Sequence, residues 1–313
     1  MPRKIIIDCD MGTDDAVALC MALFDKDLDV LAVTACEGCV TANQANNNLQ
    51  AIISEIDPTR YPRIGMASRT ENAPAVDTRF LYGDDGLGNA GLEASQRQHA
   101  HNSDKLIIDC VRAHPDEVTI LCLGPLTNLA HAFQRDPALP AMVGQVVMVG
   151  GCLDGRGNIS PCAEFNFYFD PVSAQTVLRS RSTKILIPLD VTRQVSFGLE
   201  LLDELPGEDT RMGAFLRQTL PYTYRACRQL LGMESITLND TVGTLAVLEP
   251  DLFEYEPMGG DVETEGELTR GVLVTDRRPR PEKRPNMSVA TALRAQAARQ
   301  CVIDRLLKAG SGS

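Results

Sequence analysis

Short apolar runs alternate with longer helical stretches from the first residues of the chain onward. Residues 4–7 form a β-branched run that predicts a strand, and residues 28–36 predict a second strand. Between them, residues 16–24 are apolar on every side, as in a helix that is buried in a core. A strand, a helix and a further strand in this order indicate a parallel sheet.

The same alternation continues along the rest of the sequence. Further strands are predicted at residues 118–124, 145–151, 184–190, 271–276 and 287–293. Further helices are predicted at residues 41–56, with Thr41 as the N-cap, at about 103–113, 129–133, 209–232 and 240–248, and in a final helix that ends near 308. Loop-forming residues dominate positions 57–105, and residues 277–285 form a basic, proline-rich loop.

No internal repeat or linker divides the chain. We therefore expect one large α/β domain over residues 1–309, with an open, mostly parallel sheet flanked by helices, and a flexible tail at 310–313. Ligands of such folds bind beyond the carboxyl ends of the strands. The residues expected to share one cleft there are Asp8, Asp10, Thr127, Gly150, Gly151 and Asp190.

Composition limits the possible partners. Of the 313 residues, 44% are hydrophobic and 23% are charged, as in a globular protein with a sizeable core. The net charge of −12 argues against a general binder of nucleic acids or anionic membranes. Four histidines nearly exclude a multi-histidine metal site. No apolar run is long enough to span a membrane, and the first residues do not resemble a signal peptide, so we expect a cytoplasmic protein.

The densest chemical feature is the segment 8–15, which carries four aspartates where the first strand meets the first helix: Asp8, Asp10, Asp14 and Asp15. Carboxylates packed this closely repel one another unless a cation or a proton intervenes. The helix N-terminus stabilises Asp14 and Asp15 by only about 0.3–1 kcal/mol each. A hard divalent cation with oxygen ligands, Ca²⁺ or Mg²⁺, is therefore the natural counter-charge.

Two other interpretations of this segment stay open. In the first, Asp14 caps the helix and the other acids are solvated. In the second, the Asp-x-Asp pattern belongs to a phosphohydrolase of the haloacid dehalogenase type, and Asp8 becomes phosphorylated. That pattern favours Thr or Val where this chain has Gly12, and it gives no role to the pair Asp14 and Asp15.

The segment DCDMGTDDAVAL closely resembles the opening signature of the inosine–uridine-preferring nucleoside hydrolases, Asp-x-Asp-x-Gly-x-Asp-Asp-Ala-x-Ala-Leu. Six further blocks occur in the family's order, at residues 82–88, 123–130, 149–151, 157–171, 187–192 and 239–253. The resemblance spans nearly the whole chain. Several ordered blocks are much less probable by chance than one motif.

The resemblance implies a nucleoside hydrolase fold, partly Rossmann-like, assembled as a homodimer or homotetramer that acts in nucleoside salvage. It implies hydrolysis of the N-glycosidic bond of ribonucleosides, or of a related N-riboside, to ribose and free base by a Ca²⁺-bound water. Asp10 would be the base that activates this water. The implied Ca²⁺ ligands are Asp10, Asp15, the main-chain carbonyl of Thr127 and Asp240. The implied ribose-binding residues are Asp14, Asn158, Glu164 and Asn166. Such a reaction passes through an oxocarbenium-like cation that nearby carboxylates stabilise.

Three positions depart from the family pattern. Asn239 and Tyr82 stand where many members have His, and Cys39 stands where many have Asn. General acid help is typically worth about 10²–10⁴-fold, and an amide cannot supply the proton. Tyr82 is either a proton donor or an aromatic wall for the base, whereas Cys39 is expected to pack near the metal as an unreactive thiol.

These departures leave three hypotheses. The chain is a ribonucleoside hydrolase with an unusual base preference, a hydrolase of another N-riboside whose leaving group needs little protonation, or a Ca²⁺-dependent ribose- or nucleoside-binding protein with little turnover. The sequence leaves the choice between Ca²⁺ and Mg²⁺ open, although a ligand set of more than six oxygens favours Ca²⁺.

Overall fold

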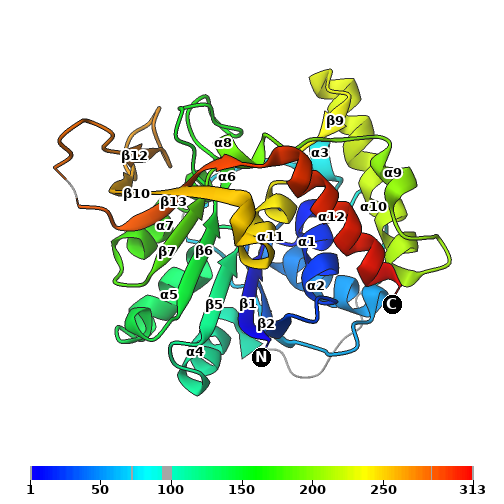
Figure 1. The fold of residues 1–313 in the computed structure, drawn as a ribbon, viewed down its shortest axis with the longest axis horizontal. Coiled ribbons are helices and arrows are strands. Elements are labelled where there is room, and N and C mark those ends of the chain that lie inside the picture. The colour runs from blue at the N-terminus through cyan, green and yellow to red at the C-terminus, as the bar shows by residue number, and fades with distance from the viewer. Residues whose placement is uncertain (1, 72, 94–100, 283, 312–313) are drawn as a thin grey trace.

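The strand order of the main sheet places the first strand near its middle (Figure 1). The computed structural model describes residues 2–71, 73–93, 101–282 and 284–311. Within these ranges, the main sheet has nine strands in the order β10-β13-β7-β6-β5-β1-β2-β3-β4. In that order they span Phe253–Met258, Met287–Leu293, Lys184–Ile187, Gln145–Val149, Val118–Cys122, Arg3–Cys9, Leu28–Ala35, Arg63–Met66 and His101–Asn102.

Strand pairing in this sheet is parallel except at one edge. Only β10 runs antiparallel, against β13. From β1 to β4, successive strands are added on one side of β1, and β5 is the first to be added on its other side. The order of strands therefore reverses between the parallel neighbours β1 and β5, in which Lys4 pairs with Val118. Such a switch point leaves a crevice at the carboxyl ends of the two strands. The predicted α/β domain with an open, mostly parallel sheet is confirmed.

Helices cover both faces of the sheet. Successive residues of β1 point to opposite faces, so Ile5 and Ile7 pack in one apolar cluster and Ile6 in the other. The first cluster includes side chains of α1, α2, α10, α11 and α12, and the second includes side chains of α4, α5 and α7. The bounds are α1 Thr13–Ala22, α2 Ala42–Ile56, α4 Ser103–Ala113, α5 Thr127–Arg135, α7 Pro171–Arg179, α10 Arg211–Ala226, α11 Asn239–Leu248 and α12 Ala295–Gly310.

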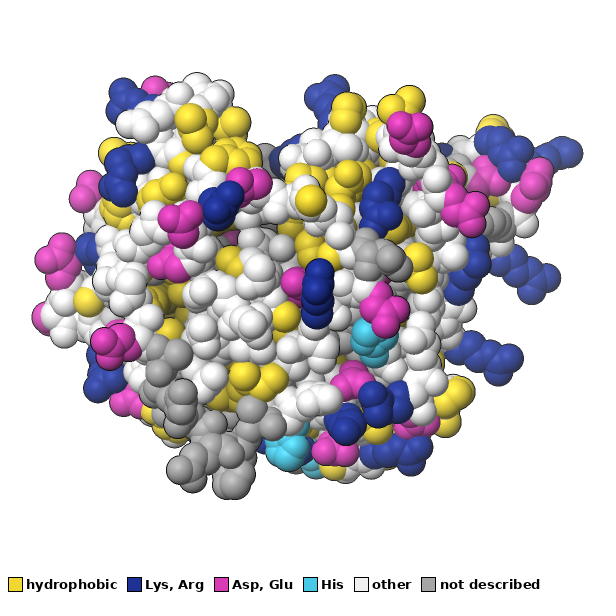
Figure 2. Space-filling model, turned by 180° about the vertical axis from the view of Figure 1, so that it is seen from behind, with side chains coloured by type: hydrophobic (Ala, Val, Ile, Leu, Met, Phe, Trp, Pro, Cys, Tyr) yellow, Lys and Arg dark blue, Asp and Glu magenta, His cyan; other side chains and the backbone are white. Residues whose placement is uncertain are grey.

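The shorter elements lie mainly in the connections. They include the helices α3 Arg79–Tyr82, α6 Phe165–Phe169, α8 Leu189–Thr192 and α9 Leu201–Glu204. The two-stranded pairs are β8 Phe197–Gly198 with β9 Ser235–Ile236, and β11 Gly260–Val262 with β12 Leu273–Thr275. On the face shown in Figure 2, acidic and basic side chains are interspersed. Among the described residues, no helix has both the length and the apolar character needed to cross a membrane.

Most predicted elements are confirmed with shifts of a few residues, and the Thr41 hydroxyl caps α2 by accepting a bond from Gln44 N. The structure adds β3, α3 and β4 to the loop predicted at 57–105, and it adds α7 and the edge strand β10 where no element was predicted. The strand predicted at 184–190 ends early, because Pro188 begins a turn into α8. The helix α12 runs through a buried Gly310, so the described part of the chain continues in helix where the tail was predicted to begin, while residues 312–313 lie outside it.

Candidate active site

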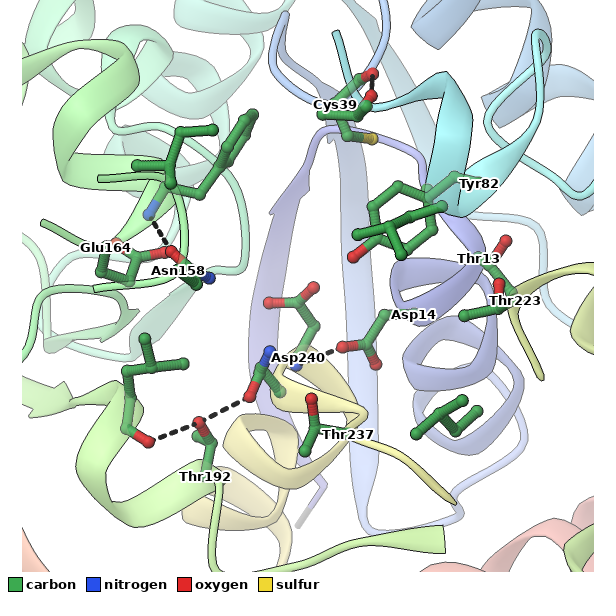
Figure 3. A pocket seen from close by; sticks show the side chains of 18 of the residues that line it. Thr13, Asp14, Cys39, Tyr82, Asn158, Glu164, Thr192, Thr223, Thr237 and Asp240 are labelled. Carbon is green, nitrogen blue, oxygen red and sulfur yellow. Dashed lines mark hydrogen bonds between the residues drawn. The ribbon is translucent and has the colours of Figure 1, made fainter. Parts of the chain in front are cut away.

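A cavity of about 570 Å³ opens at the carboxyl ends of β1, β5 and β6 (Figure 3). Its floor comes from the turn after β1 and the start of α1, and one wall comes from the start of α11. The opposite wall comes from the segment around α6, and α3, α8 and α10 line the remainder. The cavity therefore lies at the switch point of the sheet.

Asp10 is the carboxylate nearest the end of β1, and its position depends on two unusual features of the backbone. Met11 adopts a left-handed conformation, with φ of 63°, which turns the chain sharply into α1. One Asp10 oxygen accepts a hydrogen bond of 2.7 Å from the Cys39 backbone N–H. A Cβ at Gly38 would collide with the same carboxylate. Only glycine fits at that position without displacing Asp10.

Asp15 carries an unpartnered polar atom beside Asp10. Its Oδ2 accepts a bond of 2.9 Å from the Gly12 N–H, whereas its Oδ1 is buried without a hydrogen-bond partner. Burial, followed by the charge of Asp10, raises the pKa of Asp15 well above its usual range. Ligand atoms of Asp10, Asp15 and Cys39 all lie within 4.8 Å of one another. An orphaned carboxylate oxygen in this position fits a bound divalent cation.

Asp14 and Asp240 link the start of α1 to the start of α11. The Asp14 carboxylate accepts hydrogen bonds from the backbone N–H groups of Asp240 and Thr241, at 2.9 and 3.0 Å, and from the Thr241 hydroxyl at 2.6 Å. Burial nevertheless raises the pKa of Asp14 to about 6. Burial and the charges of Asp14, Asp15 and Asp10 also raise the pKa of Asp240 well above its usual range. A cation between these groups would relieve that repulsion.

Glu164 and Asn166 face the acids from the start of α6. Glu164 caps this helix, and its carboxylate accepts bonds from the N–H groups of Gly151, Asn166 and Phe167. Burial raises the pKa of Glu164 to about 7. The buried Asn166 donates to the carbonyls of Leu123 and Val149, at 2.7 and 3.0 Å. Its side-chain carbonyl has no donor in these contacts and can accept one from a ligand.

Asn158 occupies the more exposed rim of the cavity. Its Oδ1 accepts a bond of 2.8 Å from the Phe165 N–H (Figure 3). This bond fixes the orientation of the amide and leaves its NH₂ group as a donor for a ligand. The expected ribose-binding residues Asp14, Asn158, Glu164 and Asn166 thus share one cavity with Asp10, Asp15 and Asp240.

The cleft predicted from strand ends needs corrections. Thr127 does not line the cavity, because it begins α5 and its buried hydroxyl donates to Asp170. Leu123, which follows the end of β5, lines the cavity instead. Asp8 is fully buried against Thr34 and Asn128 and is likewise absent from the described wall.

Of the remaining strand-end residues, Gly150 lines the cavity, whereas Gly151 and Asp190 do not.

The two other interpretations of the acidic segment are not supported. The buried position of Asp8 does not suit the phosphorylated nucleophile of the haloacid dehalogenase interpretation. The interpretation in which Asp14 caps the first helix and the other acids are solvated is also wrong. Asp14 caps α11 instead of α1, and Asp10 and Asp15 are buried.

The three positions that depart from the family pattern all line the cavity. The Asn239 side-chain carbonyl accepts a bond of 2.8 Å from the Thr192 hydroxyl. Burial and nearby acids raise the pKa of the Tyr82 phenol well above its usual range, which makes it a weaker proton donor. Burial and the charges of Asp10 and Asp15 also raise the pKa of the Cys39 thiol well above its usual range, as expected for an unreactive cysteine.

Sequence reasoning missed several lining residues. Thr223 on α10 is buried, and its hydroxyl has no hydrogen-bond partner although it lines the cavity. Arg193 follows α8 and is the single basic side chain among the described lining residues. Neither residue lies in a recognisable motif. The apolar periodicity of 211–226 shows which face of that helix is buried, but it does not indicate that the face borders a cavity.

The family model described as "Inosine-uridine preferring nucleoside hydrolase" matches residues 5–300. The chain belongs to this family. It is 31% identical to the probable uridine nucleosidase 2 of Arabidopsis thaliana over 98% of each protein. It is 30% identical to the inosine-uridine preferring nucleoside hydrolase of Crithidia fasciculata over 90% of each.

Solved structures of nucleoside hydrolases share the fold. A plant nucleoside hydrolase is 28% identical, with a TM-score of 0.89 over 98% of this chain and 99% of that one. The purine-preferring ribonucleoside hydrolase of Gardnerella vaginalis, at 24% identity, superposes with a TM-score of 0.91. The chain is thus an enzyme of the nucleoside hydrolase family, and its family and fold support hydrolysis of ribonucleoside N-glycosidic bonds.

Proposed function

We propose that this nucleoside hydrolase cleaves the C1′–N bond of ribonucleosides with a water molecule that Asp10 deprotonates. The observation that carries the proposal is the unpartnered Asp15 Oδ1, buried beside Asp10 in a cavity that Asp14, Asp240 and Glu164 also line. An acid-rich pocket of this kind suits a cation and a sugar that becomes positively charged during reaction.

The residues that would hold the cation are Asp10, Asp15, Asp240 and a main-chain carbonyl. We assign the carbonyl to Leu123 instead of Thr127, because Leu123 lies at the cavity and Thr127 does not. Ca²⁺ fits a ligand set of several carboxylates, a carbonyl and a diol better than Mg²⁺, which demands octahedral geometry. Such a cation lowers the pKa of coordinated water and holds adjacent hydroxyls.

Each side chain of the cavity has its own role in the proposed reaction. The Asp10 carboxylate takes a proton from the attacking water, whose oxygen forms the new bond to C1′. The electron pair of the C1′–N bond departs with the base. Asn158 and Asn166 orient ribose hydroxyls through their free amide groups, and the carboxylates of Asp14 and Glu164 favour the developing positive charge.

The base side of the cavity supports a leaving group that needs little protonation. Asn239 has no acidic proton, and the raised pKa of Tyr82 makes that phenol a poor donor. The same observation favours the second candidate, a Ca²⁺-dependent ribose- or nucleoside-binding protein with little turnover. One relative is named for inosine and uridine, and we propose to test both nucleosides first.

A substrate panel distinguishes these functions. Inosine, uridine and p-nitrophenyl riboside are assayed with the metal-loaded enzyme, the metal-depleted enzyme and Asp10→Ala. We expect turnover of p-nitrophenyl riboside that falls by about 10²-fold or more in the variant. Ribose binding without any turnover would favour the binding protein. Activity that survives both Asp10→Ala and verified removal of the metal would overturn the mechanism.

We also expect the chain to form a homodimer or homotetramer, as the family resemblance implies. Light scattering coupled to size-exclusion chromatography measures this mass directly. A monomer at micromolar concentration would contradict the expectation.

A further inference from the structure

The short helix α8 contacts the loop that carries Asn158. Two consecutive backbone N–H groups of this loop, at Leu153 and Asp154, donate to the Asp190 carboxylate at 2.7 and 2.8 Å. Each carboxylate oxygen therefore accepts one bond. Asp190 lies outside the cavity, so this contact holds the loop from behind.

Arg193 holds the same loop closer to Asn158. Its Nη1 donates to the Arg156 carbonyl and its Nη2 to the Gly157 carbonyl, both at 2.7 Å. The planar guanidinium fits two neighbouring carbonyls in a way that a lysine ammonium does not. The second carbonyl belongs to the residue directly before Asn158. Arg193 thus fixes the backbone from which the proposed ribose-binding amide projects.

The backbone around Gly157 has little freedom to compensate. The Gly157 N–H donates to the Pro161 carbonyl, and the Asn158 N–H donates to the Ala163 carbonyl. A Cβ at Gly157 would collide with the carbonyls of Ser160 and Ala163. The loop is folded tightly on itself and tied to the start of α6, and Asp190 and Arg193 hold it from the side of α8.

The same helix also reaches the opposite wall of the cavity. The Thr192 hydroxyl donates to Asn239 Oδ1 at 2.8 Å, next to Asp240 in the chain (Figure 3). One four-residue helix and the residue that follows it therefore contact the Asn158 loop and the start of α11. This arrangement sets the spacing between the sugar-facing amide and the proposed metal ligand.

We propose that Asp190 and Arg193 are positioning residues that determine ribose recognition by holding Asn158 over the cavity. The inference rests on the proposed function, because it takes Asn158 as a ribose-binding residue. Both donor groups of Arg193 that face the loop are occupied by carbonyls. Its effect on substrate is therefore exerted through Asn158.

A double-mutant cycle tests this proposal. The variants are Arg193→Gln, Arg193→Lys, Asn158→Ala and Asn158→Ala combined with Arg193→Gln. We expect Arg193→Gln to raise KM for a ribonucleoside about tenfold with a smaller change in kcat, the scale expected for lost charge-assisted hydrogen bonds. Arg193→Lys should recover only part of the loss, since it cannot bond both carbonyls in one plane.

The decisive readout is non-additivity. In the Asn158→Ala background, Arg193→Gln should raise KM by less than about twofold, because the side chain on which it acts is gone. A full tenfold increase in that background would overturn the proposal, as it would mean that Arg193 binds substrate itself. An unchanged KM in the single variant would overturn it as well. Arg181→Gln, at an exposed arginine beyond α7, is the matched control.

The binding of free ribose to the Ca²⁺-loaded protein separates this inference from the proposed function. If the wild-type chain binds ribose but hydrolyses no nucleoside, the hydrolase proposal fails, while the same cycle is measured as ribose affinity by calorimetry. Equal ribose affinity of the wild type and Arg193→Gln would overturn the positioning role. Asp190→Asn should weaken ribose binding in the same direction as Arg193→Gln.

Discussion

The metal-free protein should lose stability as the pH rises through the range in which its buried acids ionise. Burial raises the pKa of Asp14 from 3.8 to about 6 and that of Glu164 from 4.5 to about 7. A carboxyl group whose pKa is higher in the folded state binds its proton more tightly there than in the unfolded chain. The stability that this proton contributes is fully present below the pKa of the unfolded chain. It is lost as the pH rises through the pKa of the folded state.

The pKa values set the size of the effect. Between about pH 5 and pH 8, linkage gives a loss of about 1 kcal/mol for Asp14 and about 2–3 kcal/mol for Glu164. The sum is about 4 kcal/mol of unfolding free energy, at an order-of-magnitude level. With an unfolding entropy of about 2.1 cal/mol/K per residue, 313 residues give roughly 1.5 °C per kcal/mol, so Tm should fall by about 6 °C.

Thermal unfolding across this pH range measures the effect, with the metal first removed and then restored. A bound cation stabilises the folded state through its affinity and neutralises the acids, so the Ca²⁺-loaded protein should show a much flatter profile. The Tm gained on adding Ca²⁺ should therefore grow as the pH rises. Asp14→Asn and Glu164→Gln should each remove part of the slope, because the amide does not titrate.

A metal-free protein that is equally stable at both ends of this range would refute the reasoning. It would mean that burial does not penalise the ionised form of these acids in the folded protein. An equal slope with and without Ca²⁺ would contradict the assignment of the cation to this cavity. Asp77→Asn supplies the control: Arg79 lowers the pKa of Asp77 to about 2, so this carboxylate stays ionised from pH 5 to pH 8 and its replacement should leave the slope unchanged.

Three further changes test other parts of the site. Gly38→Ala should abolish most turnover, because the added Cβ displaces the Asp10 side chain; retained kcat would contradict this. Thr223→Val should stabilise the free protein by about 1 kcal/mol, since it removes an unpaired buried hydroxyl, and should raise KM for any nucleoside whose base bonds that hydroxyl. The p-nitrophenyl riboside should react about 10²–10⁴-fold faster than inosine or uridine if leaving-group protonation is missing, and equal rates would indicate a functioning acid.

The order of strands and helices could be predicted because it depends on local apolar patterns. The run at 4–7 is buried on both faces of a parallel sheet and reads as a strand without tertiary information. The short strands β3 and β4 were not predictable in the same way. They lie near one edge of the sheet, and Arg63 and His101 are exposed in them, so their pattern resembles a loop.

The acids of the site could be predicted as a group, but their individual contacts could not. The resemblance places Leu123 and Thr127 in one block of the family pattern, at 123–130, whereas only the fold shows which of the two residues lies at the cavity. Strand β5 ends at Cys122, which leaves Leu123 at the carboxyl edge, and Thr127 is already within α5. A difference of four residues in the sequence therefore separates a cavity residue from a structural one.

The capping and metal-binding interpretations of the acid cluster turn out to be compatible. Asp15 accepts the Gly12 N–H at the start of α1, Asp14 accepts N–H groups at the start of α11, and Glu164 does so at the start of α6. Each carboxylate is thus held at the positive end of a different helix, which lowers the cost of keeping several acids close together. Capping alone leaves Asp15 Oδ1 unpartnered. Helix capping therefore explains how the acids are positioned, and the proposed cation would explain why they converge.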